Sequence, residues 1–306
     1  MSKAIQLIDD HNVQLARGIT VPITKIEKIH IHKFRLYEDV EIKLGDKITV
    51  IAGHNATGKS TLLSLLGHCA ELKGADKKPL IHRSFGTDFS EIIKASEAFD
   101  KRISSAYTLY FRNNDEVESL TLRTGWQKYN DSKRFRIIPK ETPERRTVRK
   151  IAWPTLYLGL SRLYPVGESD QPKKLNVRLT SEQKAEFFQA HRRILSLYEE
   201  PNDCVPITLR EKKTVGIETN TYDFICNSAG QDNLSQIIMA VLSFKALKEQ
   251  SGNAWKGGLF LIDELDAALH PAAQENLFKY LYQAAETLEI QIAFTTHSLR
   301  ICEILT

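Results

Sequence analysis

The sequence lacks the features that mark membrane-embedded, secreted and zinc-bound proteins. None of its apolar runs approaches the roughly 20 residues of a membrane-spanning helix, and its first residues carry no apolar stretch typical of a signal peptide. The four cysteines are scattered, without the spacing of a zinc site or a disulfide framework: Cys69, Cys204, Cys226 and Cys302. We therefore expect a cytoplasmic protein in a reducing setting, with no membrane partner.

A strong charge imbalance is also missing. The chain carries 42 Lys and Arg against 38 Asp and Glu, and the resulting net charge of +4 is too small to indicate a nucleic-acid partner by itself. Its 306 residues, 42% hydrophobic and 26% charged, suit a globular protein with a substantial core. No internal repeat or low-complexity tract interrupts the chain, so we expect a single domain over 1–306.

The segment GHNATGKST, residues 53–61, matches the pattern G-x-x-x-x-G-K-[ST] at every fixed position. A β-branched run at 48–52 precedes it and an apolar helical pattern follows, which is the strand–loop–helix context that a phosphate-binding loop needs. The lysine would reach the β- and γ-phosphates and the serine hydroxyl would bind Mg²⁺. The predicted nucleotide-binding residues of this loop are Gly53, Asn55, Gly58, Lys59, Ser60 and Thr61.

A second acidic motif, LFLIDELD at 259–266, consists of four apolar residues that lead into carboxylates. A buried strand that ends there would place the carboxylates at the carboxyl edge of the sheet, beside the phosphate-binding loop. Asp263 is expected to hold Mg²⁺ together with Ser60. Glu264 is expected to orient or deprotonate the attacking water.

Hydrophobic periodicity outlines the remaining elements. Strands are predicted at 23–32, 35–44, 48–52, 106–111, 119–123, 155–160, 222–226, 258–262 and 290–295. Helices are predicted at 61–67, 180–198, 234–247 and 271–288. The helix at 180–198 begins with Thr180 or Ser181 as its cap, and Gln183 can complete a capping box. The alternation of strands and helices predicts an α/β core, with a helical or irregular insertion at about 75–220.

Further motifs, in the right order, give the sequence its resemblance to the ATP-binding-cassette (ABC) ATPases. Asn227-Ser-Ala-Gly-Gln231 resembles the signature whose usual core is Leu-Ser-Gly-Gly-Gln, although Asn227 and Ala229 differ from it. Leu265-Asp266 resembles the D-loop, and Thr295-Thr-His297-Ser298 resembles the switch histidine segment.

The resemblance implies a P-loop ATPase core with a mixed sheet and N-terminal antiparallel strands, with ATP and Mg²⁺ as its ligands. It further implies a homodimer, or a higher oligomer, that holds ATP between two protomers. The P-loop of one protomer and the signature residues Ser228, Gly230 and Gln231 of the other would contact the same nucleotide. Asp266 would lie at this interface, and His297 would sense the γ-phosphate.

Within the class, Ile31–Val40 and the third P-loop residue Asn55 resemble the SMC and recombination-repair branch, with Ala56 where glycine is common. In that branch Lys33, Phe34 and Arg35 would approach the nucleotide; a plain strand face explains them nearly as well. No Q-loop glutamine is recognisable between 70 and 110. SMC-type proteins separate the two halves of their ATPase by long coiled coils. Here no sustained heptads lie between the P-loop and the signature, which indicates a relative with short arms.

Short phrases such as Leu156–Tyr164 and Ser228–Leu234 also resemble the ATPase subunits of bacterial anti-phage systems of the Septu type. This resemblance implies a partner nuclease of the HNH kind and a link to a retron. A repair or chromosome-associated ATPase that acts directly on DNA is the alternative, and a transporter subunit is a weaker one. No nuclease chemistry is assigned to the chain itself.

Three features leave alternatives open. The basic run at 133–150 could bind DNA or RNA, bind a partner's acidic face, or be a solvated loop. Arg162, after an apolar strand, could face a phosphate or form an ion pair at the core edge. The sequence ends at Thr306, shortly after His297, whereas relatives continue with further helices, so we expect a truncated or abbreviated C-terminal part.

Overall fold

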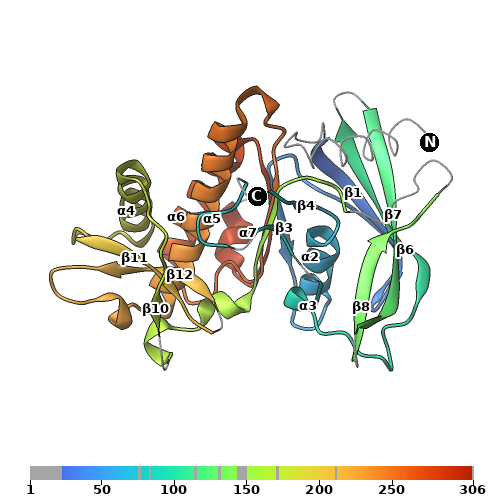
Figure 1. Cartoon of the computed structure of the whole chain (residues 1–306), viewed down its shortest axis with the longest axis horizontal. Helices are drawn as coiled ribbons and strands as arrows, with labels where there is room; N and C mark the ends of the chain where they lie inside the picture. The colour runs from blue at the N-terminus through green and yellow to red at the C-terminus, as the bar shows by residue number, and fades with distance from the viewer. Residues whose placement is uncertain are drawn as a thin grey trace.

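The computed structural model describes residues 23–74, 77–82, 84–87, 89–113, 116–129, 132–142, 150–169, 172–210 and 212–304. Two main sheets with helices between and beside them form the body of the molecule (Figure 1). The α/β class with a parallel sheet and antiparallel strands, predicted from the sequence, is confirmed.

The first sheet is antiparallel and has the strand order β2-β1-β6-β7-β8. Its strands are β1 (Ile23–Phe34), β2 (Tyr37–Lys43), β6 (Ile103–Asn113), β7 (Glu116–Tyr129) and β8 (Ser132–Pro139). Apolar and polar residues alternate along them, so one face of the sheet packs on the core while the other meets solvent. The predicted strands at 23–32, 35–44, 106–111 and 119–123 all lie within this sheet.

The second sheet is parallel, with the strand order β3-β14-β13-β9. Its strands are β3 (Ile48–Ala52), β14 (Gln291–Thr296), β13 (Leu259–Ile262) and β9 (Thr155–Leu158). Every residue of β13 and β14 is buried, as expected for a sheet covered on both faces. The carboxyl ends of these strands meet at one edge, which carries the P-loop, the acidic motif and the switch segment.

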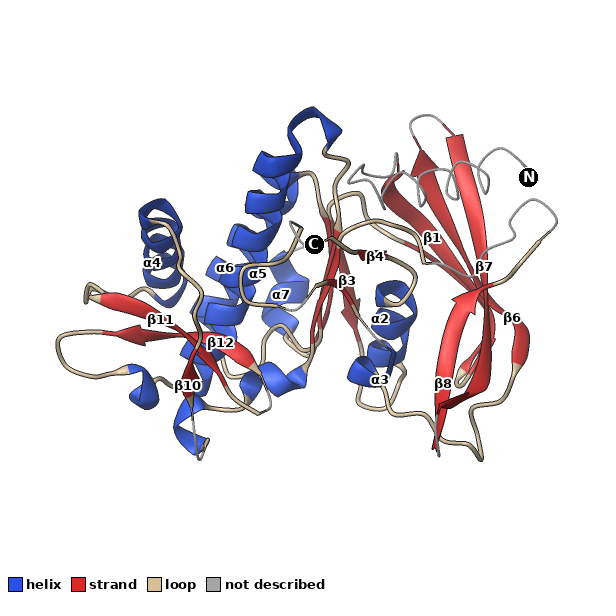
Figure 2. Ribbon diagram, viewed as in Figure 1, coloured by secondary structure: helices blue, strands red, loops and turns tan. Residues whose placement is uncertain are grey.

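Helices cover both faces of the parallel sheet (Figure 2). Helix α2 (Lys59–Gly67) lies between the two sheets, where the Tyr107 hydroxyl of β6 donates to the Leu65 carbonyl oxygen at 3.0 Å. Helices α5 (Ala229–Ser251) and α6 (Pro271–Leu288) lie on the other side, and α7 (Leu299–Ile304) follows the switch segment. The predicted helix at 271–288 is confirmed, whereas that at 234–247 extends further at both ends.

A smaller lobe beside α5 and α6 contains α4 (Ser181–Leu195) and a three-stranded sheet (Figure 1). The strands are β10 (Lys173–Lys174), β11 (Asp203–Thr208) and β12 (Lys213–Glu218). The predicted capping box of α4 is confirmed, because Thr180 and Gln183 bond each other's backbone. The insertion predicted at about 75–220 is not one separate unit: among its described residues, β6–β8 and β9 belong to the two main sheets, whereas α4 and β10–β12 form the smaller lobe.

The remaining elements are short. They are β4 (Glu71–Leu72), β5 (Phe85–Gly86), α3 (Phe89–Ile92) and four 3-10 turns: η1 (Leu160–Leu163), η2 (Val166–Glu168), η3 (Phe224–Cys226) and η4 (Gly252–Ala254). The predicted strand at 222–226 is wrong. The Asp223 side chain accepts a hydrogen bond from the Ile225 N–H and starts the turn η3 instead. Among the described residues, no helix is long and apolar enough to cross a membrane.

Candidate nucleotide-binding site

The P-loop leaves β3 in a conformation that depends on glycine. Gly58 has φ 93°, and a Cβ atom there would lie 3.0 Å from the Tyr37 ring. The Tyr37 hydroxyl donates to the Gly58 carbonyl oxygen at 3.1 Å, so a side chain of β2 holds the end of the loop in place. Ala56 has φ 62°, in the left-handed region that costs a residue with a side chain about 1–2 kcal/mol. The loop therefore stores strain at the position where relatives commonly have glycine.

The Lys59 side chain folds back over the loop. Its ammonium group donates to the carbonyl oxygens of Gly53 at 2.9 Å and His54 at 2.7 Å. The cation thus sits at the centre of the loop, beside backbone N–H groups at the N-terminus of α2. Both features favour an anion at this point.

Asp263 lies directly opposite the P-loop serine. Its Oδ1 accepts hydrogen bonds from the hydroxyls of Ser60 at 3.1 Å and Thr295 at 2.6 Å. The Tyr157 hydroxyl lies 3.5 Å from its Oδ2. A carboxylate and a hydroxyl at hydrogen-bonding distance are hard oxygen donors of the kind that Mg²⁺ takes, usually with phosphate oxygens completing the shell. The donor set therefore fits Mg²⁺.

Glu264 has a backbone that is fixed on both sides. Its N–H donates to Thr295 Oγ1 at 2.6 Å, and its carbonyl oxygen accepts from Arg162 at 2.7 Å. Its φ of 51° is unusual for a residue with a side chain. Its side chain lines a pocket of about 340 Å³ together with residues of the P-loop, Asp263 and His297.

Asp266 holds the switch segment. Its Oδ1 accepts from the Thr296 hydroxyl at 2.5 Å and from the His297 N–H at 3.1 Å. The His297 side chain is exposed and borders both the 340 Å³ pocket and a second pocket of about 370 Å³ behind the P-loop. Within this chain, Asp266 therefore fixes the backbone at His297 through these two hydrogen bonds.

The signature residues lie at the start of α5 and do not line the P-loop pocket. Ser228 caps the helix, and its side chain and that of Gln231 form a capping box with each other's backbone N–H. A Cβ atom on Gly230 would lie 2.5 Å from the Ala268 carbonyl oxygen, so glycine is required by this close approach. Asn227 exchanges two hydrogen bonds with the backbone of Ile217 in β12.

Arg162 connects the acidic motif to helix α5, which begins at the signature. Arg162 is only 1% exposed. Besides Glu264, its guanidinium donates to Asn233 Oδ1 at 2.7 Å and to the carbonyl oxygens of Gly159 at 2.9 Å and Leu158 at 3.3 Å. Burial lowers the pKa of Arg162 to about 10, so the group stays charged at neutral pH. The sequence left a phosphate-facing arginine and an ion pair at the core edge as alternatives; the contacts described are instead hydrogen bonds to backbone carbonyl oxygens and to Asn233, so the structure shows a third arrangement, a buried structural arginine.

The Lys33–Arg35 segment is occupied by contacts within the chain. Lys33 pairs with Glu38 at 2.8 Å, and Phe34 is buried. Arg35 lines the P-loop pocket, but its guanidinium makes two 2.9 Å hydrogen bonds to the carboxylate of Asp100. The strand-face alternative therefore describes Lys33 and Phe34, while only Arg35 borders the pocket.

The structure describes only part of the basic run at 133–150. Lys133, Arg134, Arg136 and Lys140 lie on or just after β8, at the edge of the antiparallel sheet. Lys133 pairs with Glu97 at 2.7 Å. Arg145, Arg146 and Arg149 lie outside the described residues. Nucleic-acid binding by this run stays a prediction.

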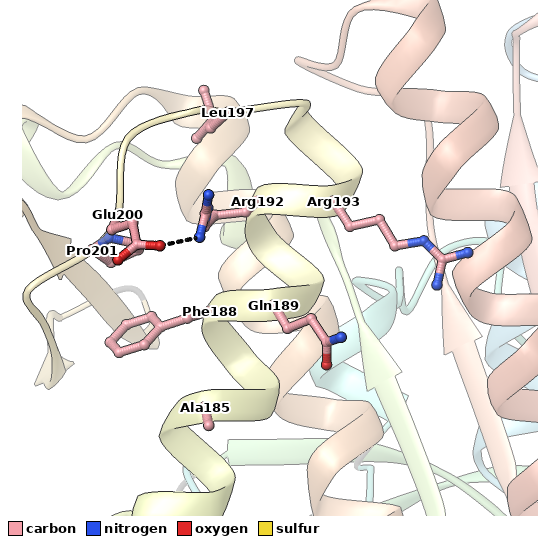
Figure 3. Close-up of a pocket in the computed structure, with 8 residues that line it drawn as sticks. All are labelled: Ala185, Phe188, Gln189, Arg192, Arg193, Leu197, Glu200 and Pro201. Carbon is pink, nitrogen blue, oxygen red and sulfur yellow. Dashed lines mark hydrogen bonds and ion pairs between the residues drawn. The ribbon is translucent and has the colours of Figure 1, made fainter.

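Another pocket, of about 470 Å³, lies on α4 and the segment that follows it (Figure 3). Its polar feature is the ion pair between Arg192 and Glu200 at 2.9 Å. It contains none of the residues predicted from the motifs and no loop suited to a phosphate. We therefore place the candidate site at the P-loop pocket, whose lining residues are Arg35, Leu36, Asn55, Ala56, Thr57, Gly58, Lys59, Ser60, Thr61, Asp263, Glu264 and His297.

Comparison with known proteins agrees with this geometry. The family model described as "AAA domain, putative AbiEii toxin, Type IV TA system" matches residues 48–303. The chain belongs to this family. The match begins at β3 and includes every motif of the candidate site, from the P-loop to the switch segment. No match was found among the curated proteins compared.

Solved structures show the same fold. The SMC head bound to the C-winged helix domain of ScpA is 16% identical, covers 91% of each chain and gives a TM-score of 0.54. The SMC head domain from Thermotoga maritima is 15% identical, with 91% of each chain covered and a TM-score of 0.50. This family member therefore has the ABC-type P-loop ATPase fold of SMC heads.

Proposed function

We propose that this family member binds Mg-ATP at the P-loop pocket, hydrolyses it, and uses the bound nucleotide to join two copies of the chain. The observation that carries the proposal is the convergence of three motifs on one pocket. Lys59 and Ser60 come from the P-loop, Asp263 and Glu264 from the acidic motif, and His297 from the switch segment, yet all of them line the same 340 Å³ space.

The residues of the pocket have distinct roles in this proposal. Lys59 and the P-loop N–H groups hold the phosphates, while Ser60 and Asp263 hold Mg²⁺, which neutralises phosphate charge when bound. Glu264 accepts a proton from the water that attacks the γ-phosphate. His297 lies close enough to the pocket to contact that phosphate. Each role uses the charge and hydrogen-bonding capacity that the side chain already presents.

Dimerisation explains why the signature lies apart from the P-loop. The Ser228 side chain is exposed at the N-terminus of α5, and a helix N-terminus favours an anion. These groups do not line the P-loop pocket of their own chain. In a head-to-head dimer they would meet the γ-phosphate held by the partner's P-loop. Asp266 and His297 would then lie at the interface.

For the biological setting, we propose that the ATP-dependent dimer regulates a partner effector, an HNH-type nuclease in anti-phage defence. Its support is the resemblance of Leu156–Tyr164 and Ser228–Leu234 to Septu-type ATPases, and the matched family's description, which names a toxin. The alternative is an ATPase that acts directly on DNA. It is favoured by the exposed Arg134 and Arg136 on an edge strand and by the SMC-head fold.

The mass of Glu264→Gln with and without Mg-ATP, measured by light scattering, tests the dimer. Removing the proton acceptor leaves the phosphate contacts in place, so the bound state should accumulate and the mass should double. Ser228→Arg, added to this variant, should keep the mass at one chain. Ser104→Arg is a matched control, because Ser104 is an exposed serine on β6 away from the pocket.

The outcomes separate the parts of the proposal. A mass that never changes, although ATP binds, would contradict the nucleotide-dependent dimer. Lys59→Ala should abolish ATP binding, and retained binding would refute the assignment of the pocket. Stimulation of wild-type ATPase by DNA, lost on Arg136→Ala, would favour direct action on DNA over nuclease regulation.

A further inference from the structure

The end of β9 lies beside the acidic motif of the candidate site. Leu158 of β9 lies in register with Ile262 of β13, and the Asp263 N–H donates to the Leu158 carbonyl oxygen at 2.9 Å. The two parallel strands therefore end side by side. Residues at the end of β9 lie next to the acidic motif, although about 100 residues separate the two in sequence.

Tyr157 uses this position to reach the carboxylate of Asp263. Its hydroxyl lies 3.5 Å from Oδ2, at the outer limit of a hydrogen bond, while Oδ1 accepts from Ser60 and Thr295. The phenol hydroxyl can donate to this carboxylate oxygen.

The surrounding loop holds the ring in place. A Cβ atom on Gly159 would lie 2.9 Å from the edge of the Tyr157 ring and 3.1 Å from its hydroxyl oxygen, so the ring fits because residue 159 is glycine. Arg162 donates to the carbonyl oxygens of Leu158 and Gly159 and so fixes the backbone on the far side of the ring. The tyrosine is packed with its polar end toward the metal-binding carboxylate.

A purely structural tyrosine looks different in this molecule. Tyr107 is fully buried, and its hydroxyl donates to a helix carbonyl oxygen, that of Leu65. Tyr157 is instead partly exposed, and the partner of its hydroxyl is an ionisable side chain of the candidate site. This difference indicates a role in the site rather than in the core.

We infer that Tyr157 is a positioning residue for Mg²⁺: its hydroxyl donates to Asp263 Oδ2 and orients this carboxylate toward Ser60 and the metal. The inference rests on the proposed function, because it assumes that Ser60 and Asp263 hold Mg²⁺. Hydrogen-bond donors to a metal-ligating carboxylate typically change metal affinity by about 10–100-fold when they are removed.

The test compares Tyr157→Phe with the wild-type chain. Binding of a fluorescent ATP derivative, mant-ATP, is measured by anisotropy in EDTA and in saturating Mg²⁺, and the ratio of the two affinities gives the gain from Mg²⁺. In Tyr157→Phe this gain should fall by roughly tenfold, while the affinity in EDTA should stay unchanged. Tyr107→Phe, the matched loss of a buried phenol hydroxyl, should keep the full gain.

A second variant tests the route through Asp263. In an Asp263→Asn background, Tyr157→Phe should change the gain no further, because the acceptor that Tyr157 orients has already lost its charge. If Mg²⁺ increased the mant-ATP affinity of Tyr157→Phe as much as that of the wild-type chain, the inference would be overturned. It would also be overturned if Tyr157→Phe lost the same factor of affinity in EDTA as in Mg²⁺. If the wild-type chain bound no mant-ATP in Mg²⁺, the proposed function itself would be refuted, which is a separate result.

Discussion

Asn227 departs from the leucine usual at its position in ABC signatures, and the structure predicts that restoring leucine destabilises the protein. The side chain is 4% exposed and bridges the signature to β12. Its Oδ1 accepts from the Ile217 N–H at 2.8 Å, and its Nδ2 donates to the Ile217 carbonyl oxygen at 3.0 Å. Asn227→Leu removes both bonds and leaves two buried backbone groups without a partner.

The expected loss follows from these two groups. A buried polar group that loses its partner costs about 1–3 kcal/mol, so two groups cost about 2–6 kcal/mol. The larger apolar side chain of leucine recovers roughly 1–2 kcal/mol through burial. The free energy of unfolding should therefore fall by about 1–4 kcal/mol. Because Ser228 follows directly, the cap of α5 should shift as well, which would weaken the ATP-dependent dimer.

Urea unfolding followed by tryptophan fluorescence measures the loss. Asn253→Leu is the matched control, because Asn253 is exposed in a 3-10 turn and should change stability by less than about 0.5 kcal/mol. Asn227→Asp, which keeps the acceptor but removes the donor, should fall between the two. If Asn227→Leu were as stable as the wild-type chain, the two bonds to Ile217 would not be what holds this residue, and the reasoning would be refuted.

Three further predictions concern other contacts of the site and core. Gly230→Ala places a Cβ atom against the backbone oxygen of Ala268, and a backbone atom cannot rotate away as a side chain can. The start of α5 should therefore shift, so light scattering should show a weaker dimer, while anisotropy should show unchanged mant-ATP binding. Arg162→Met leaves the Glu264 carbonyl oxygen unpaired; stability should fall by about 2–4 kcal/mol, and ATP turnover should fall more than mant-ATP affinity. Burial lowers the pKa of His191 to about 4, so the folded state binds fewer protons than the unfolded one below pH 6.5, and stability is lost as pH falls toward 4. At pH 5 this loss is about 2 kcal/mol, and His191→Phe should remove it in a comparison of unfolding at pH 5 and 7.5.

The elements that the sequence predicted well are those whose signal is local. The P-loop needs a strand, glycines and a helix start within about 20 residues, and the structure has all three at β3 and α2, although β3 is half-buried rather than buried. The capping box of α4 is equally local, since Thr180 and Gln183 lie three residues apart. In both cases short-range hydrogen bonding and burial decide the structure, so the pattern in the chain is sufficient.

The missed features depend on contacts between distant segments. The strand predicted at 222–226 has suitable residues, but Asp223 starts a turn and Asn227 binds to β12. The role of β9 as a neighbour of β13 was hidden in a range expected to be an insertion. Tyr157 lies in a predicted strand and in the phrase Leu156–Tyr164, but neither pattern indicated a role in the site; the pairing of two strands about 100 residues apart brings it to Asp263. Tyr157 also lies outside residues 70–110, the range in which a Q-loop glutamine was expected.

The contacts of Arg162 give the proposed dimer a physical link between its two ATP sites. In a head-to-head arrangement, Glu264 of one chain acts on the ATP held by its own P-loop, whereas the signature of the same chain contacts the partner's ATP. Arg162 binds the Glu264 carbonyl oxygen and also Asn233, which lies on α5 one turn after the signature. Because α5 is one continuous and largely buried helix, a shift of its N-terminus on phosphate binding would be transmitted through the buried Arg162 side chain to Glu264. Arg162→Lys, which keeps the charge but cannot make all of these contacts, should therefore reduce cooperativity between the two sites more than it reduces ATP binding at either.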